Sequence, residues 1–515
     1  MKSSSSKSKS KGKEKPTSLS GLWRGKGNEW LILLTAVATV ALMAWIISGR
    51  SIGIRGEWTW PMRIVAGARF WAPLGGVALL IATAGWLTRP KRWERTRRRW
   101  RAVWIIWLVM VAWLLAAGVL IIPQNPVVVT GGIIASPQAT SYFSVAVNIT
   151  DLPATVKSFP ALMETFPQHA RTHPPGPILF FWGVNRLVHA WPGLAKATEA
   201  VCVRLDKDGT EHLSQVLHQQ FGIPITRTEA LAAVFSAFLL AGLGSLSLIP
   251  LYMLASSLYG STTAMRATLL FATVPSFLLF GPSIDQLVLL FAVLTLWGFL
   301  LLRRTGNPLI GLFLALGLLI SLGLVAMFAF IGLWWLLGRS VLPENVADKR
   351  KMVMGIVGAL LIFIGVYVIL WLAVGLNLPA IIKAGLAVHR HTTLEEASRA
   401  YWKWVIYDPI EFAIFLGLPL MLWALLAVRG DNQRAALGGF ALAWVGTLLL
   451  LDVSGWVRAE TGRIWLFLMP PAALLGAVRL GQLGKRFDLG FFSVLVLQMG
   501  QAITMKAGLD IFILK

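Results

Sequence analysis

Long apolar segments constrain the fold of this chain more than any other feature. Hydrophobic residues make up 56% of its 515 residues and charged residues only 14%. They are arranged in many runs that approach the ~20 residues with which a helix crosses a bilayer. We therefore expect an all-α polytopic membrane protein. The single cysteine, Cys202, excludes an internal disulfide framework and a cysteine-based metal cluster.

Basic residues are concentrated beside the apolar segments. The net charge is +24, and two dense clusters, 1–30 and Arg89–Arg101, supply much of it. Basic clusters that flank membrane helices are typical of cytoplasmic anchors facing anionic lipid. This placement favours membrane lipids as partners and argues against nucleic acid.

These charges also orient the expected helices. The basic tail, 1–29, puts the N-terminus in the cytoplasm, and further inside markers are Arg303-Arg304, 349–351, Arg429 with Arg434, and Lys485-Arg486. The apolar stretch 309–338 must cross an even number of times, so we expect two short helices hinged at Ser321-Leu322-Gly323. About 13 spans result, near 30–48, 70–88, 102–122, 229–257, 265–282, 286–302, 309–321, 323–338, 353–374, 409–427, 435–451, 464–480 and 489–508.

This topology leaves a long first outer loop, 123–228. Its segment 177–191 is short and interrupted by Asn185, Arg186 and His189, so we expect a surface or half-inserted helix that does not cross. The predicted organisation begins with a tail at 1–29 and an extra hairpin of two helices with a basic loop at 30–101. A transmembrane core follows at 102–338, and C-terminal helices occupy 339–515, with outer loops at 375–408 and 452–463. All seven histidines then fall on the outer side, which we expect to be the active face.

The run His169-Ala-Arg-Thr-His173-Pro-Pro-Gly-Pro177 sets two imidazoles and Arg171 at a membrane edge. Spacing of i, i+4 on a helix could hold a metal, but a residue before proline avoids the α region. A divalent metal, a phosphate or hydroxyl contact, and a structural hydrogen bond all remain open for this pair.

Two further polar clusters lie beside outer helix ends. Asp285 follows Gly281-Pro-Ser-Ile, where it either caps a helix or does chemistry. Arg458, Glu460 and Arg463 could hold a phosphate, or Glu460 and Arg463 could form an i, i+3 salt bridge.

Another outer cluster combines histidines with acids and aromatic residues. His389, Arg390 and His391 precede Glu395-Glu396 and Arg399-Ala-Tyr-Trp402. This pattern indicates a mobile lid, an acceptor-binding loop, or a solvated loop with an amphipathic surface helix.

Several of these patterns, in order along 102–335, resemble the GT-C superfamily of membrane glycosyltransferases, the protein O-mannosyltransferase-like and aminoarabinose-transferase-like enzymes. The resemblance rests on the segment His173-Pro-Pro-Gly-Pro-Ile-Leu-Phe-Phe-Trp182, on Asp285 after a helix pair, and on the Gly-rich segment Gly311–Gly323. The segment after Glu460 resembles one found in uncharacterised bacterial members. The chain departs from the family at 139–143, where an early acid is missing, and at His173, where the family has lysine.

The resemblance implies a GT-C-like bundle and inverting transfer of a sugar from a polyprenyl phosphate to an acceptor hydroxyl, outside a bacterial cell membrane. Such a reaction needs a base on the acceptor and positive groups on the leaving phosphate. The candidate bases are Asp285, Asp151 and Glu164, the candidate phosphate ligands are His173, Arg171, Arg463 and Arg458, and the candidate substrate contacts are Tyr142, His169, Glu460, His389, Arg390 and His391. Because the usual acid is missing, a catalytically inactive scaffold is the alternative, and a transporter is the third reading.

Overall fold

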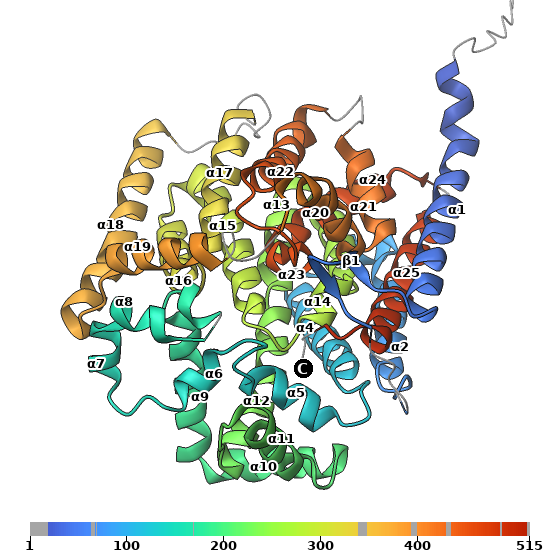
Figure 1. The fold of residues 1–515 in the computed structure, drawn as a ribbon. Coiled ribbons are helices and arrows are strands. Elements are labelled where there is room, and N and C mark those ends of the chain that lie inside the picture. The colour runs from blue at the N-terminus through green and yellow to red at the C-terminus, as the bar shows by residue number, and fades with distance from the viewer. Residues whose placement is uncertain are drawn as a thin grey trace, which may run out of the picture.

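The protein is almost entirely helical (Figure 1). The computed structural model describes residues 19–62, 67, 69–167, 169–337, 348–392, 399–428, 434–484 and 487–511. Within them, the single sheet is an antiparallel hairpin of β1 (Ile52–Ile54) and β2 (Trp58–Trp60), in which Ile52 pairs with Trp60. Most of the basic tail, Glu395-Glu396, Arg429 and Lys485-Arg486 lie outside the described residues.

Six helical segments of the described chain are long and apolar enough to cross a membrane, which agrees with an all-α membrane protein. They are 29–47 of α1 (Leu19–Ile47), α4 (Arg98–Leu120), α12 (Arg227–Ser245) joined to α13 (Leu248–Phe271), α15 (Asp285–Thr305), α18 (Lys349–Val374) and α25 (Phe487–Gly508). A seventh segment is the pair α20 (Tyr401–Leu416) and α21 (Leu418–Val428), which is bent by 110°.

The expected total of 13 spans is therefore not confirmed. Several segments expected to cross form shorter apolar helices: α2 (Leu74–Leu87), α16 (Leu309–Ile320), α17 (Ala326–Leu337), α24 (Met469–Gly481) and the part of α22 (Arg434–Ser454) from Gly439 onward. The hinge between α16 and α17 is confirmed, because the 3₁₀ turn η3 (Leu322–Val325) separates them. There the Ser321 hydroxyl accepts a hydrogen bond from the Gly323 N–H.

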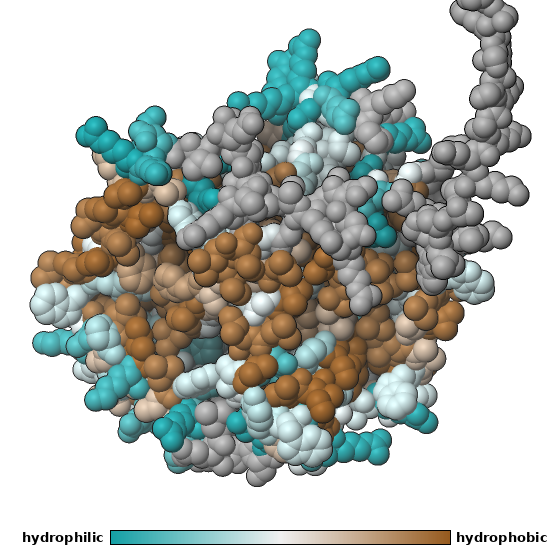
Figure 2. Space-filling view, turned by 90° about the horizontal axis from the view of Figure 1, so that it is seen from above, coloured by the Kyte–Doolittle hydropathy of each residue, from teal (hydrophilic) through white to brown (hydrophobic). Residues whose placement is uncertain are grey.

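A broad hydrophobic belt crosses the molecular surface, and hydrophilic residues gather on both sides of it (Figure 2). Helix α18 contributes bare apolar side chains such as Leu361 and Leu372, which are 65% and 73% exposed. Large exposed apolar surfaces are uncommon on soluble monomers, and lipid tails would cover this one.

The basic segments meet at one end of the helices. Arg304, near the end of α15, donates to the Ser257 carbonyl at 2.6 Å, and the turn that follows α15 packs on the backbone of Lys351. Trp93, in α3 (Pro90–Arg95), donates to the Ser261 carbonyl at 2.9 Å. Among the described residues, Arg304, Lys351 and the helix α3 of the Arg89–Arg101 cluster thus share one end, and Asp285 begins α15 at the other.

Helix α13 reverses direction at Gly260, which has φ 82° and ψ 164°. Before this kink, Gly244 lies against the Gln286 side chain, and after it the Phe277 carbonyl of α14 (Pro275–Leu279) accepts from Gln286 Nε2 at 3.0 Å. The chain therefore leaves the level of Gln286 and returns to it between Gly244 and Phe277.

The expected first outer loop, 123–228, is mostly helical, and the short helix expected at 177–191 corresponds to α9 (Gly176–Ala190). The segment folds into α5 (Pro126–Ala135), α6 (Tyr142–Ala146), α7 (Leu152–Lys157), α8 (Phe159–Leu162), the 3₁₀ turns η1 (Met163–Thr165) and η2 (Ala170–Thr172), α9, α10 (Pro192–Leu205) and α11 (Gly209–Phe221). Helices α5, α9, α10 and α11 form a layer with the start of α12 at the bottom of Figure 1. The charged stretch after 193 is helical because it is amphipathic: α11 buries Leu213 and Leu217.

Candidate functional site

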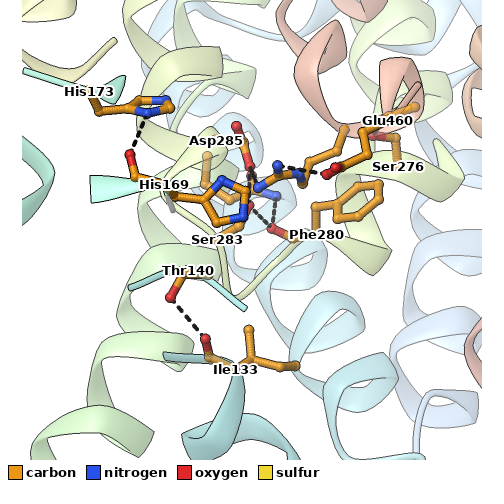
Figure 3. Close-up of polar contacts among 12 residues, drawn as sticks. Ile133, Thr140, His169, His173, Ser276, Phe280, Ser283, Asp285 and Glu460 are labelled. Carbon is orange, nitrogen blue, oxygen red and sulfur yellow. Dashed lines mark hydrogen bonds and ion pairs between the residues drawn. The ribbon is translucent and has the colours of Figure 1, made fainter. Parts of the chain in front are cut away.

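An ion-pair cluster at the start of α15 is the centre of the candidate site (Figure 3). The Arg463 guanidinium lies 3.6 Å from Asp285 Oδ2 through one NH2 group and 2.8 Å from Glu460 Oε2 through the other. The side chains of Arg463, Asp285 and Glu460 retain 12%, 18% and 16% of their exposed surface. Solvent-sized molecules therefore reach all three, although most of each side chain is covered.

A strained turn carries the Arg463 side of the cluster. Ala459 and Glu460 have φ values of 79° and 60°, the left-handed region that non-glycine residues rarely adopt. Helix α20 holds this turn: the Ala459 N–H donates to Asp408 Oδ1 at 3.1 Å, and the Gly462 N–H donates to Glu411 Oε1 at 3.1 Å. Backbone strain that the surroundings maintain is a common property of functional sites.

A compact turn carries the Asp285 side. Gln286 Nε2 donates to the carbonyl oxygens of Phe277 and Phe280, each at 3.0 Å, which fixes the turn between α14 and α15. The Ser283 hydroxyl lies 2.9 Å from Asp285 Oδ2. Asp285 thus sits in the first turn of a helix, where the peptide dipoles favour a negative charge; the capping and the chemical interpretations are compatible here.

The two histidines of the Pro-Pro motif do not form a helical i, i+4 pair. A 3₁₀ turn separates them, and His173 is extended at φ −111° and ψ 152°, as its following proline predicts. His173 Nδ1 lies 3.0 Å from the His169 carbonyl oxygen, whereas the His169 ring points toward Asp285 (Figure 3). Among the described residues, no group of three His, Cys, Asp or Glu side chains is placed to hold a metal.

Both imidazoles are neutral at pH 7. Burial, followed by the Arg463 charge, lowers the pKa of His169 to about 4. Burial, with His169 as the next cause, lowers the pKa of His173 to about 3. Neutral imidazoles both donate and accept hydrogen bonds, so His169 suits a hydroxyl group beside Asp285.

Tyr142 closes the site from α6. Its buried ring packs edge-on against His173 at 5.4 Å, and burial and then the Asp285 charge raise the pKa of its hydroxyl, which remains a donor. The preceding Ser141 has φ 60°, and its hydroxyl accepts from the Ala170 N–H at 2.9 Å. This bond ties α6 to the turn that bears His169.

Two of the three candidate bases are not part of this arrangement. Asp151 is exposed and caps α7 by accepting from the Ala154 N–H at 3.0 Å, and Glu164 is exposed on η1. Within the described residues, neither carboxylate has a hydrogen bond or ion pair with the cluster. Of the three candidates, Asp285 alone lies beside Arg463. Arg171 is half-buried, and its Nε has no hydrogen-bond partner in the described structure.

The remaining candidates belong to a neighbouring structural cluster. Arg458 donates to the carbonyl oxygens of Gly455 and Arg399, at 3.2 and 2.8 Å, so its guanidinium braces two loops. His389 ends α19 (Leu378–His389), stacks on Trp456 and has Nε2 at 2.9 Å from the Trp456 carbonyl oxygen. Arg390 and His391 are exposed beyond it.

Sequence reasoning missed the roles of Asp408 and Glu411. Two acids spaced i, i+3 in an apolar segment were a visible signal, because ionisable residues in such helices are rarely without function. Compared with known protein families and with curated proteins, the chain matches none.

Proposed function

We propose that this protein is a membrane glycosyltransferase that transfers a sugar from a polyprenyl phosphate to an acceptor hydroxyl, with inversion, at the outer face of a bacterial cytoplasmic membrane. The observation that carries the proposal is the accessible Asp285 carboxylate 3.6 Å from the Arg463 guanidinium, at the end of a membrane helix opposite the basic end. A base beside a cation is the minimum that such a transfer needs. The GT-C-like order of the sequence motifs supports the same reaction.

In the proposed transfer, Asp285 is the general base. Asp285 accepts the acceptor's O–H proton while that oxygen forms a bond to the sugar's anomeric carbon. The bond from this carbon to the phosphate oxygen breaks, and its electron pair leaves with the polyprenyl phosphate. Arg463 and the Tyr142 hydroxyl donate to the phosphate, Arg171 offers its unpartnered Nε, and His169 orients the acceptor.

The inactive scaffold is favoured by one observation. Arg463 already faces two carboxylates, Asp285 and Glu460, so the three groups together carry a formal charge of −1. A resting site that neutralises its own arginine is suited to holding a structure together. A donor phosphate must therefore compete with Glu460 for Arg463.

Turnover of a radiolabelled polyprenyl-phosphate sugar by purified protein, with a crude glycan acceptor, separates the two functions. We expect release of polyprenyl phosphate, a loss of about 10²–10⁴-fold in rate for Asp285→Asn, and no loss for Glu211→Gln, a control at an exposed acid on α11. Wild-type turnover in Asp285→Asn would remove Asp285 as the base. No release by the wild type would favour the scaffold.

A further inference from the structure

The β-hairpin formed by β1 and β2 contacts the elements that carry both sides of the Asp285–Arg463–Glu460 cluster. It lies within 30–101, the segment that the resemblance to the GT-C superfamily implies is an addition to the core. We propose that this hairpin sets the Asp285–Arg463 geometry, with Glu57 as a positioning residue. The inference rests on the proposed function only for what the cluster does; the geometry stands apart from it.

Glu57 attaches the hairpin to the start of α20. Its carboxylate accepts from the Ala400 N–H at 2.9 Å, from Trp404 Nε1 at 2.8 Å and from Lys403 Nζ at 2.6 Å. The Glu57 side chain is only 8% exposed. A covered carboxylate with three donors is held in one position, because each bond to a charged group is stronger than a neutral one.

Helix α20 carries this attachment to the Arg463 turn. One turn beyond Trp404, the Tyr407 hydroxyl accepts from the Gly53 N–H of β1 at 2.7 Å, a second link to the hairpin. The next residue, Asp408, and then Glu411 hold the amides of Ala459 and Gly462. The hairpin and the Arg463 turn are therefore bonded to adjacent positions of one helix.

Trp60 of β2 reaches the Asp285 side directly. Its ring lies 5.7 Å from Phe280, which opens the turn before Asp285, and 5.2 Å from Phe415 of α20. Phe415 in turn packs so tightly on Gly462 that a Cβ there would lie 2.3 Å from its ring. Trp60 thus sits between the two segments whose separation defines the ion pair.

Hydrogen exchange read by mass spectrometry tests this directly, because the Ala459 and Gly462 amides are bonded to α20. In Glu57→Gln we expect exchange in 459–464 to accelerate about tenfold or more, with exchange in α24 unchanged. Tyr407→Phe, which removes only the hydroxyl facing Gly53, should accelerate the same peptide to a smaller extent. Glu211→Gln is the matched control and should change neither peptide.

The outcomes separate this inference from the proposed function. If Glu57→Gln and Tyr407→Phe both leave exchange in 459–464 as in the wild type, the hairpin is merely attached and the inference is overturned, whatever the activity. If exchange rises but the wild type releases no polyprenyl phosphate, the inference stands and only the glycosyltransferase proposal fails. If the wild type is active, Glu57→Gln should lower kcat, and Glu57→Asp should partly restore it.

Discussion

Replacement of Arg463 by glutamine is the sharpest test of the cluster. The substitution removes the only cation that pairs with both Asp285 and Glu460 in the described structure, and it leaves two largely covered carboxylates facing each other. Breaking a buried ion pair by removing one partner typically costs about 3–5 kcal/mol. At 1.4 kcal/mol per factor of ten, the folding equilibrium should fall roughly 100- to 4000-fold.

The loss of folding stability in Arg463→Gln should depend on pH. Burial alone would raise the pKa of Glu460, but Arg463, His169 and Arg399 outweigh it and hold that pKa below its ordinary value. A carboxylate with a lowered folded pKa adds stability above its unfolded pKa of ~4.3 and loses it as the pH falls through the folded value. The difference between wild type and Arg463→Gln should thus be full at pH 7 and shrink below about pH 4.

The assay is equilibrium unfolding by SDS in mixed micelles, followed by tryptophan fluorescence. Arg227→Gln is the matched control, since Arg227 pairs with Glu199 at the surface with side chains 68% and 35% exposed. Such exposed pairs contribute about 0–1 kcal/mol. A midpoint for Arg463→Gln no lower than that of Arg227→Gln would refute the claim that pairing with Arg463 stabilises the two largely covered carboxylates.

Two substitutions test the strained turn. Gly462→Ala should destabilise the protein by about 1–3 kcal/mol through overpacking against Phe415, and thermal unfolding measures this loss. The control is Gly332→Ala, which should not lower the melting temperature because a Cβ at that position would meet nothing within 4 Å. Ala459→Gly should raise the same melting temperature, because glycine relieves a left-handed conformation that costs roughly 1–2 kcal/mol. A lower melting temperature for Ala459→Gly would mean that its methyl packing outweighs the strain.

The helices were largely predictable from the sequence, since apolar runs between basic residues define them. The expected span 286–302 corresponds to α15 (Asp285–Thr305), and the hinge at Ser321 lies where the structure has it. The helices α10 and α11 within the expected outer loop 123–228 were not predicted, although the spacing of Leu213 and Leu217 on one face of α11 is typical of an amphipathic helix.

The candidate site was predictable only in part. Asp285, Glu460 and Arg463 each stood out, and the structure joins them. Asp151 also stood out, but the Pro153 that follows it marks a helix start, and capping explains its position. Nothing in the sequence singled out Glu57, because its hydrogen-bond partners lie more than 340 residues away in the chain.

That separation has a consequence for how the protein is made. Glu57 and the Ala400 amide are 343 residues apart, so at synthesis rates of about 5–20 residues per second roughly 17–70 s pass before the partner emerges. During that interval the hairpin is already outside the ribosome without its partners on α20. The site is thus completed only when one of the last helices inserts, and a nascent chain stopped before α20 would present an unpaired carboxylate and the uncovered Trp60 to membrane chaperones.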